Sequence, residues 1–479
     1  MLGHIGHNEI QLRQVARFPN NPVRTIDGLH WNVLELYRNA VAGLASALRD
    51  EPELRSVGVD AWAVDYGLFR GDRMLGNPFH YRDERSEAGV ADTHALVSPA
   101  ELYARNGLQF LPFNTLYQLA AERRSGGLLD GGGDDAGHTQ AGLSPGADSM
   151  LLIPDLLNFW LTGTRLAERT NASTTGLLNV ASGQWDDDLI ARLGLPRGMF
   201  PTLIDAGQRV GPLRASVAAE IGLGTGADAA KARAINVVAV GSHDTASAVV
   251  AVPMTSQNSA YISCGTWGLV GVELEHSVLS DASRRANFTN EGGVDGRVRF
   301  LHNVMGLWLL SESVRSWERG GESIHLPALL AEAAALRSPV STFDANDPSF
   351  MAPGDMPARI AAWLTEHDRE VPRSRAEFVR SIIESLADAF AHAVRTASDL
   401  SGLAVETVHI VGGGSQNELL CQLTADRTGL PVLAGPVEAT AIGNVLIQAR
   451  AHGLVTGDLE TLRALVARAF VPKRYGPRA

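Results

Sequence analysis

A short apolar run followed by small residues and an aspartate constrains the fold of this 479-residue chain more than any other stretch. Residues 235–240 (Ile-Asn-Val-Val-Ala-Val) predict a buried strand, and Gly-Ser-His-Asp-Thr-Ala-Ser-Ala follows at 241–248. Small residues at this point let a helix begin close to the sheet edge, so Asp244 is expected to face a cleft, as a general base does. The alternative is that Asp244 only caps the helix. His243 likewise either binds a substrate hydroxyl or satisfies a hydrogen bond in the core.

Length and composition limit the classes of protein that need to be considered. A chain of this length predicts two or more domains. The formal net charge of -12 argues against nucleic acid as the main partner. No apolar run approaches the length of a membrane span, and we expect no membrane partner. Two cysteines, Cys264 and Cys421, fit a reducing compartment, so a cytoplasmic location is predicted.

The scarcity of lysine excludes two large classes of nucleotide-binding protein. Lys231 and Lys473 are the only lysines, and no Gly-Lys-Ser or Gly-Lys-Thr occurs. A P-loop needs that lysine on the phosphates, and a protein kinase needs a strand lysine and a His-Arg-Asp loop, which are also absent. If the chain binds ATP, backbone N–H groups, hydroxyls and a metal ion must hold the phosphates.

Two glycine-containing turns are candidates for that role. Residues 260–263 and 268–273 predict two strands joined at Gly265-Thr266, where free N–H groups and the Thr266 hydroxyl could hold phosphate oxygens. Residues 408–411 predict a strand that leads through Gly412-Gly413-Gly414 into a helix, so a nucleotide could lie against the backbone at Gly413. The alternatives are an ordinary hairpin turn and an ordinary tight strand-to-helix connection.

The remaining patterns alternate between strand and helix and predict an α/β protein with two domains, 1–250 and 251–479. Residues 57–69 predict a strand, and Ser374-Arg-Ala-Glu377 forms a capping box ahead of a long apolar-striped helix. Residues 122–147 form a Gly-rich insertion. Asn303 could bond a sugar hydroxyl, although taken alone a helix-capping role is the better interpretation.

Several stretches together resemble one family, the FGGY carbohydrate kinases, and within it the members that act on L-rhamnulose. They are Phe110–Gln118, Thr289–Gly293, Asn303–Leu309, Gly412–Asn417, Gly435–Ala439 and Ile442–Asn444, in addition to the segment around Asp244. The resemblance implies an actin-like, ribonuclease H-like fold of two domains with ATP and sugar in the cleft between them. It also implies the reaction, which transfers phosphate from ATP with Mg²⁺ to the C1 hydroxyl of L-rhamnulose.

The resemblance also implies roles for single residues. Asp244 matches the proton acceptor, and His243, Asp244, Thr245 and Asn303 match sugar contacts. Thr266 and Gly413 match ATP contacts. Two positions depart from the family: Ala63 stands where a sugar-contacting glycine is expected, and Ser311 stands where a glutamine contacts ATP. No residue of the chain is assigned to a metal.

A third departure concerns the start of the chain. The family begins with a strand carrying Asp-x-Gly and a Ser-Ser-Gly-Arg phosphate loop, whereas the first aspartate here is Asp27 and no such loop occurs. We therefore expect an upstream start codon and poor phosphate transfer by the chain as given. The alternatives are another ketose or polyol kinase of the family, or a non-catalytic relative that binds a sugar or a nucleotide.

Overall fold

The computed structural model describes residues 1–6, 9–124, 129, 146–223 and 234–478, so most of the Gly-rich insertion predicted at 122–147 lies outside the described residues. Contacts divide the chain into two compact units. Unit 1 comprises Met1–Val250, Glu275–Val298 and Thr440–Leu465, and unit 2 comprises Ala251–Leu274, Arg299–Ala439 and Val466–Ala479. Two segments from later in the sequence, Glu275–Val298 and Thr440–Leu465, thus belong to unit 1. The domain boundary at 250/251 stays a prediction.

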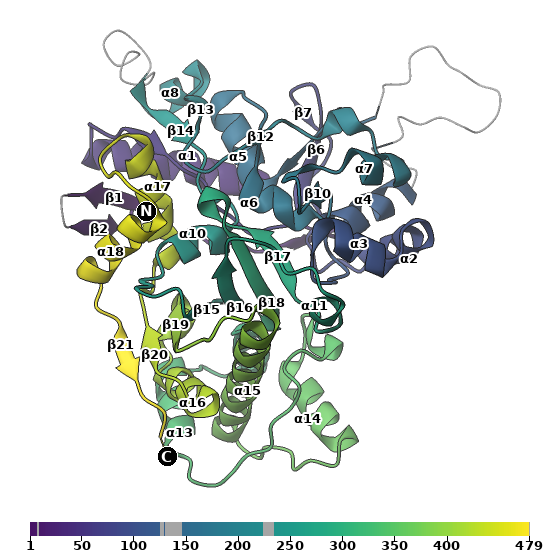
Figure 1. The fold of residues 1–479 in the computed structure, drawn as a ribbon, viewed down its shortest axis with the longest axis vertical. Helices are drawn as coiled ribbons and strands as arrows, with labels where there is room; N and C mark the ends of the chain where they lie inside the picture. Colours follow the sequence, from purple (N-terminus) through teal and green to yellow (C-terminus); the bar gives the residue numbers. More distant parts are fainter. Residues whose placement is uncertain (7–8, 125–128, 130–145, 224–233, 479) are drawn as a thin grey trace. The chain divides into compact units, whose positions relative to one another are not determined.

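Unit 1 contains short strands and mostly short helices (Figure 1). Its strands are β1 Leu2–Ile5, β2 Ile10–Arg13, β3 Val23–Arg24, β4 Leu29–His30, β5 Ser56–Val57, β6 Tyr66–Arg70, β7 Arg73–Met74, β8 Ser149–Leu152, β9 Ala167–Glu168, β10 Leu178–Asn179, β11 Gln184–Trp185, β12 Leu203–Ile204, β13 Arg209–Pro212, β14 Asn236–Val238 and β17 Thr289–Gly292. Its helices are α1 Val33–Asp50, α2 Ser86–Leu96, α3 Pro99–Asn106, α4 Thr115–Arg124, α5 Ile153–Thr162, α6 Arg169–Ala172, α7 Asp187–Arg192, α8 Ala215–Glu220, α10 Asp244–Val250, α11 Asp281–Arg285, α17 Ala439–Ala451 and the first part of α18 Leu459–Ala469, which ends in unit 2.

The strand predicted before Asp244 is β14, the middle strand of the sheet β13–β14–β5. It pairs in parallel with β5, in the register Asn236↔Ser56 and Val237↔Val57. Val237 and Val238 are fully buried, because the sheet lies in an apolar cluster that also contains residues of α1 and α8. Burial on both faces explains the continuous apolar run that the sequence showed.

Unit 2 contains one larger sheet and longer helices (Figure 1). Its strands are β15 Ser259–Cys264, β16 Trp267–Leu274, β18 Val298–Met305, β19 Thr407–Val411, β20 Val432–Ala434 and β21 Lys473–Tyr475. Its helices are α12 Trp308–Arg319, α13 Leu326–Ala335, α14 Met356–Glu366, α15 Arg375–Ser401 and α16 Glu418–Thr428, with the 3₁₀ turn η5 at Gly413–Gln416.

The strands of unit 2 follow the order β18–β16–β15–β19–β20–β21. β15 and β16 form the predicted antiparallel hairpin, whereas β15 and β19 are parallel. The capping box predicted at Ser374 and Glu377 is present and begins α15, which packs against β16. Its predicted apolar stripe is buried, against β16 and the helices α13 and α16.

The prediction of one continuous strand over 57–69 is wrong. The chain forms β5 at Ser56–Val57 and β6 at Tyr66–Arg70, with irregular backbone between them. Val64 has a φ of 67°, which a β-branched residue rarely adopts and which a strand cannot contain. Hydrogen bonds from Thr115 and Gln118 stabilise the irregular backbone between the two strands.

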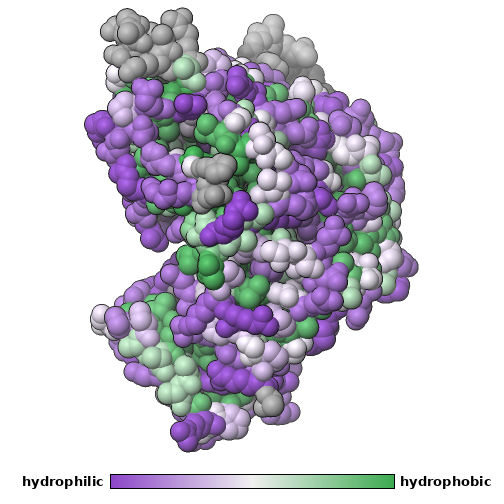
Figure 2. All heavy atoms as spheres, turned by 60° about the vertical axis from the view of Figure 1, so that its left-hand side comes forward, coloured by the Kyte–Doolittle hydropathy of each residue, from purple (hydrophilic) through white to green (hydrophobic). Residues whose placement is uncertain are grey.

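Charged and polar side chains cover most of the face drawn in Figure 2, and apolar ones gather there only in small groups. Large apolar side chains that are strongly exposed, such as Ile26 and Val471, lie far apart in the sequence. No helix in the described part of the chain is long and apolar enough to cross a bilayer.

Candidate active site

Two segments from distant parts of the sequence run side by side at the predicted base. A parallel bridge joins Ala61 to His243. The Ala61 N–H donates to the Ser242 carbonyl, and the Asp244 N–H donates to the Ala61 carbonyl, both at 2.9 Å. Ala63 lies two residues beyond this ladder. The structure therefore gathers Ala63 and residues 243–245 on adjoining segments of unit 1.

Asp244 begins helix α10 and keeps its side chain accessible. The side chain is 47% exposed, so a ligand hydroxyl can reach the carboxylate. Its Oδ1 accepts the Thr245 hydroxyl at 3.2 Å. Among the described residues the carboxylate accepts no backbone N–H of the helix, so the alternative of a simple helix cap has no support here. A half-exposed carboxylate at a strand-to-helix junction suits proton acceptance.

A buried carboxylate that the sequence did not reveal anchors this junction. Glu168 Oε2 accepts the N–H of Ser242 at 3.0 Å and its hydroxyl at 2.8 Å, and also the Thr170 hydroxyl at 2.5 Å. Burial raises the pKa of Glu168, and these hydrogen bonds oppose that rise. Glu168 thereby fixes the backbone two residues before Asp244. Ser242 lies 74 residues from Glu168 in sequence, so no local pattern could identify this contact.

The His243 side chain lies between two carboxylates. Its Nδ1 is 3.3 Å from Oε2 of Glu291, and its Nε2 is 3.6 Å from Oδ1 of Asp244. His243 and Glu291 are both buried, with side chains 8% and 7% exposed. Under the alternative that His243 makes a contact in the core, Glu291 is therefore the specific partner. Glu291 belongs to the Thr289–Gly293 segment that carried part of the family resemblance, although no role was predicted for it.

Asp60 is a further carboxylate near the base. Burial, with a contribution from the field of Asp244, raises the pKa of Asp60 to about 7, and the hydrogen bond from Asn444 opposes the rise. Asn444 Nδ2 donates to Asp60 Oδ2 at 2.5 Å. Asp60 directly precedes Ala61 of the ladder. No local pattern distinguishes Asp60 from other aspartates, because its partner Asn444 lies 384 residues away.

The candidate sugar contact Ala63 lies in a backbone segment that is held in an unusual conformation. Val64 has positive φ, and its carbonyl accepts the Thr115 hydroxyl at 2.7 Å. The neighbouring Trp62 indole N–H donates to Asp65 at 3.0 Å. Strained backbone that is fixed from outside is typical of ligand sites. Thr115 comes from the Phe110–Gln118 stretch, whose part in the site is therefore to support this turn.

The predicted ATP contacts come together within unit 2. Thr266 lies in the β15–β16 turn, where the Gly265 N–H donates to the Trp267 carbonyl at 2.8 Å. The first turn of α12, which contains Ser311, is attached to it, since the Trp308 N–H donates to the Thr266 carbonyl at 3.1 Å. Thr266 and Ser311 are both exposed.

The glycine loop rests against the same turn. A side-chain carbon at Gly414 would overlap the Cys264 sulfur, and one at Gly412 would lie 2.9 Å from the Cys264 carbonyl oxygen. These two positions therefore require glycine, and Gly412 also has a φ of 81°. Beside Gly413 there is open space. Cys264 is buried, which raises its pKa to about 12, so it fills space rather than reacting.

Asn303 corrects one interpretation of the sequence. The residue lies inside β18, partly buried, and α12 begins only at Trp308. The prediction that Asn303 caps a helix is wrong, because the strand continues to Met305. The Met305 N–H then donates to Asn346 Oδ1 at 3.1 Å. The residue remains a candidate sugar contact.

Comparison with known proteins gives a consistent result. Residues 260–452 match the C-terminal domain of the FGGY family of carbohydrate kinases, and residues 137–251 match the N-terminal domain. The rhamnulokinase of Pectobacterium carotovorum is 40% identical over 99% of this chain and 90% of its own length. That of Bacteroides thetaiotaomicron is 36% identical over 100% of this chain and 93% of its own length.

Solved structures agree on the fold. The xylulose kinase of Rhodospirillum rubrum aligns with a TM-score of 0.71 at 20% identity, over 96% of this chain and 88% of its own. The gluconate kinase of Lactobacillus acidophilus aligns with a TM-score of 0.73 at 16% identity, over 96% of this chain and 87% of its own. The expected two-domain α/β sugar kinase fold is confirmed. The chain belongs to the FGGY family of carbohydrate kinases.

Proposed function

We propose that this chain transfers the γ-phosphoryl group of ATP to the C1 hydroxyl of L-rhamnulose, with Asp244 as the general base. The observation that carries the proposal is the similarity to rhamnulokinases, at 36% to 40% identity over nearly the whole chain. The half-exposed carboxylate of Asp244 supports it. Two buried free thiols, Cys264 and Cys421, support a cytoplasmic location.

In this proposal the sugar binds beside the base. Ala63, His243, Thr245 and Asn303 contact its hydroxyls, and Asp244 accepts the C1 proton as the C1 oxygen bonds to the γ-phosphorus and ADP leaves. Ala63 brings a methyl group where the family has glycine. That methyl is tolerated if the contact is made through the backbone, which the neighbouring Val64 and Thr115 hold in place.

Thr266, Ser311 and Gly413 are proposed to contact ATP. The open space beside Gly413 fits a nucleotide that lies against the backbone. The exposed hydroxyls of Thr266 and Ser311 can donate to phosphate oxygens. Among the described residues no three His, Cys, Asp or Glu side chains form a metal-binding group. Mg²⁺ bound with ATP would neutralise negative charge on the phosphate oxygens.

The test of the base is the substitution Asp244→Asn. The amide keeps the shape of the side chain but cannot accept the proton, and we expect a fall of about 10²–10⁴ in kcat with sugar binding retained. Calorimetry measures sugar binding, and coupled ADP release measures turnover. Asp187→Asn, at a side chain that is 73% exposed, is the matched control. Activity of Asp244→Asn within a few-fold of wild type would exclude Asp244 as the base.

The test of the substrate is a panel of sugars. We expect the largest kcat/KM with L-rhamnulose, compared with D-xylulose, L-ribulose and glycerol. A larger value for one of the other three would favour the alternative of another ketose or polyol kinase. Binding of a sugar without ADP release, in the wild-type chain, would favour a non-catalytic relative.

A further inference from the structure

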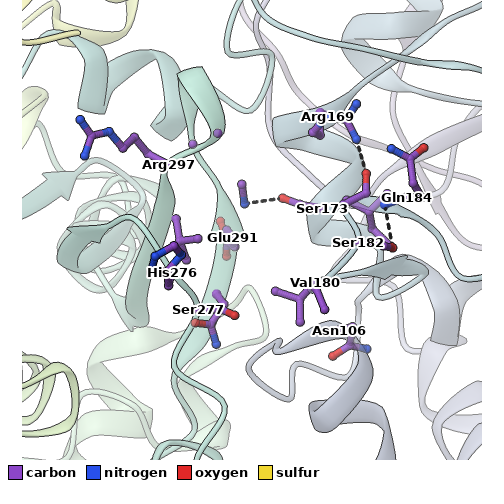
Figure 3. A pocket seen from close by; sticks show the side chains of 18 of the residues that line it. Asn106, Arg169, Ser173, Val180, Ser182, Gln184, His276, Ser277, Glu291 and Arg297 are labelled. Atoms are coloured by element: carbon purple, nitrogen blue, oxygen red, sulfur yellow. Dashed lines mark hydrogen bonds between the residues drawn. The ribbon is translucent and has the colours of Figure 1, made fainter. Parts of the chain in front are cut away.

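A cavity of about 430 Å³ opens in unit 1 (Figure 3). Its wall includes Ser173, Ser182 and Gln184 on one side and His276 and Arg297 on the other, with Glu291 between them. None of the predicted sugar or ATP contacts lines it. Glu291 is the residue that connects this cavity with the candidate active site, because its carboxylate also faces His243.

Three side chains form a row that ends at the base. Glu291 Oε2 lies 3.3 Å from His243 Nδ1, and His243 Nε2 lies 3.6 Å from Asp244 Oδ1. The backbone on both sides of Glu291 is fixed. The Gly292 N–H donates to the Ser173 hydroxyl at 2.8 Å, and the Asn290 N–H donates to the Gly107 carbonyl at 2.8 Å. These bonds fix the backbone, and from it the carboxylate reaches ion-pair distance of the imidazole.

The place of His243 between Glu291 and Asp244 determines where its ring carries a proton. A carboxylate at Nδ1 favours the tautomer that carries its proton on Nδ1, and the lone pair of Nε2 then faces Asp244. The 3.6 Å separation is a few tenths of an ångström beyond hydrogen-bond reach, and catalytic hydrogen bonds often tighten only when the substrate is bound. An imidazolium at this place would be stabilised by the buried carboxylate of Glu291.

We propose that Glu291 is a positioning residue that acts through His243. It orients the imidazole so that Nε2 accepts from Asp244 the proton that Asp244 has removed from the sugar hydroxyl. The hydroxyl O–H bond breaks, its oxygen bonds to phosphorus, ADP leaves, and the proton passes from Asp244 to His243, where Glu291 stabilises the cation until the proton returns to solvent. This inference rests on the proposed function, in which Asp244 is the base.

The first experiment compares two carboxylates of the same cavity. In the full chain, Glu291→Gln is expected to lower kcat by about 10- to 100-fold with the Kd for L-rhamnulose changed less than 3-fold, and Glu291→Asp should restore part of the loss. The control is Glu275→Gln, because Glu275 also lines the cavity but pairs with Arg297, at 3.3 Å. The control should leave kcat unchanged.

A double-mutant cycle with His243→Gln distinguishes an effect of Glu291 on the position of His243 from a general disturbance of the structure. If Glu291 acts through His243, the double variant should be no slower than His243→Gln alone. Full additivity would overturn the proposal. So would a Glu291→Gln enzyme with kcat within 2-fold of wild type while Asp244→Asn is inactive. An active Asp244→Asn would instead refute the proposed function itself.

If Glu291→Gln folds poorly, the position of the His243 proton can be measured instead of the rate of catalysis. ¹⁵N NMR of the histidine rings, with the His243 signal assigned by its loss in His243→Gln, should show the proton on Nδ1 in wild type. In Glu291→Asp, where the shorter side chain withdraws the carboxylate, the proton should move in part to Nε2. A His243 ring that carries its proton only on Nε2 in wild type would overturn the proposal.

Discussion

Replacement of Asp65 should be among the most destabilising single changes in unit 1. Its side chain is fully buried and accepts four hydrogen bonds. Oδ2 accepts from Trp31 Nε1 at 2.5 Å, Trp62 Nε1 at 3.0 Å and the Tyr81 N–H at 3.2 Å, and Oδ1 accepts from Gln118 Nε2 at 3.0 Å. Asp65→Ala leaves these donors without that acceptor, at about 1–3 kcal/mol for each one that stays buried and unpaired.

The carboxylate itself is costly to bury, and its removal offsets part of this loss. Burial raises the pKa of Asp65 from 3.8 to about 6, against the effect of the four donors. That shift corresponds to about 3 kcal/mol at neutral pH. The net cost expected for Asp65→Ala is therefore on the order of 4 kcal/mol. Asp65→Asn keeps an oxygen for three donors and loses the charge, so about 1–2 kcal/mol is expected.

Urea unfolding followed by tryptophan fluorescence measures both variants, since Trp31 and Trp62 report directly on the site. Asp72→Asn is the control, because the Asp72 side chain is 88% exposed, and it should change the unfolding free energy by less than about 0.5 kcal/mol. An acid whose folded pKa is raised loses stability as pH rises toward that pKa. The free energy of unfolding of wild type should therefore fall between about pH 4 and 6, and that of Asp65→Asn should fall less. A cost below about 1 kcal/mol for Asp65→Ala would refute this account of the site.

Three further outcomes are expected. The pKa of Asp60 is raised to about 7, so its contribution to stability is lost as pH rises through that value. The free energy of unfolding of Asp60→Asn relative to wild type, measured in urea, should therefore be on the order of 2 kcal/mol larger at pH 8 than at pH 5. A side-chain carbon on Gly443 would overlap the Ser247 carbonyl oxygen, so Gly443→Ala should lower the melting temperature by several degrees, and an unchanged melting temperature would contradict the close helix contact. Thr266→Val should raise the KM for ATP by about 2- to 10-fold and leave the KM for sugar unchanged, and an equal rise in both would argue against a phosphate contact.

The features that could be predicted from the sequence are those with local causes. The capping box at Ser374 specifies the start of α15 because both partners lie within one turn. The hairpin around Thr266 follows from two apolar runs and a Gly-containing turn. The position of Asp244 at a strand-to-helix junction was also predicted, because an apolar run and small residues define both sides of it.

The features that could not be predicted have distant causes. The strand expected over 57–69 is interrupted because Thr115 and Gln118 hold the Val64 carbonyl and Asp65 from another helix. Asn303 resembled a helix cap because a helix begins shortly after it, at Trp308. Pairing within the sheet of unit 2 extends the strand past Asn303 instead. In both cases tertiary hydrogen bonding overrides a local pattern.

Helix α17 shows most directly how a segment distant in sequence completes the site. Gly443 lets α17 approach α10, because only a missing side chain leaves room for the Ser247 carbonyl. The next residue, Asn444, then reaches Asp60, and one turn later Gln448 accepts the Ser56 hydroxyl at 2.7 Å. Gln448 also donates to the Asn444 amide oxygen at 2.5 Å, which fixes the amide so that its N–H₂ group faces Asp60. The charge state of Asp60, beside the candidate base, therefore depends on a helix that begins near residue 439, and a change in the packing of α17 should alter catalysis at Asp244 without touching the sugar.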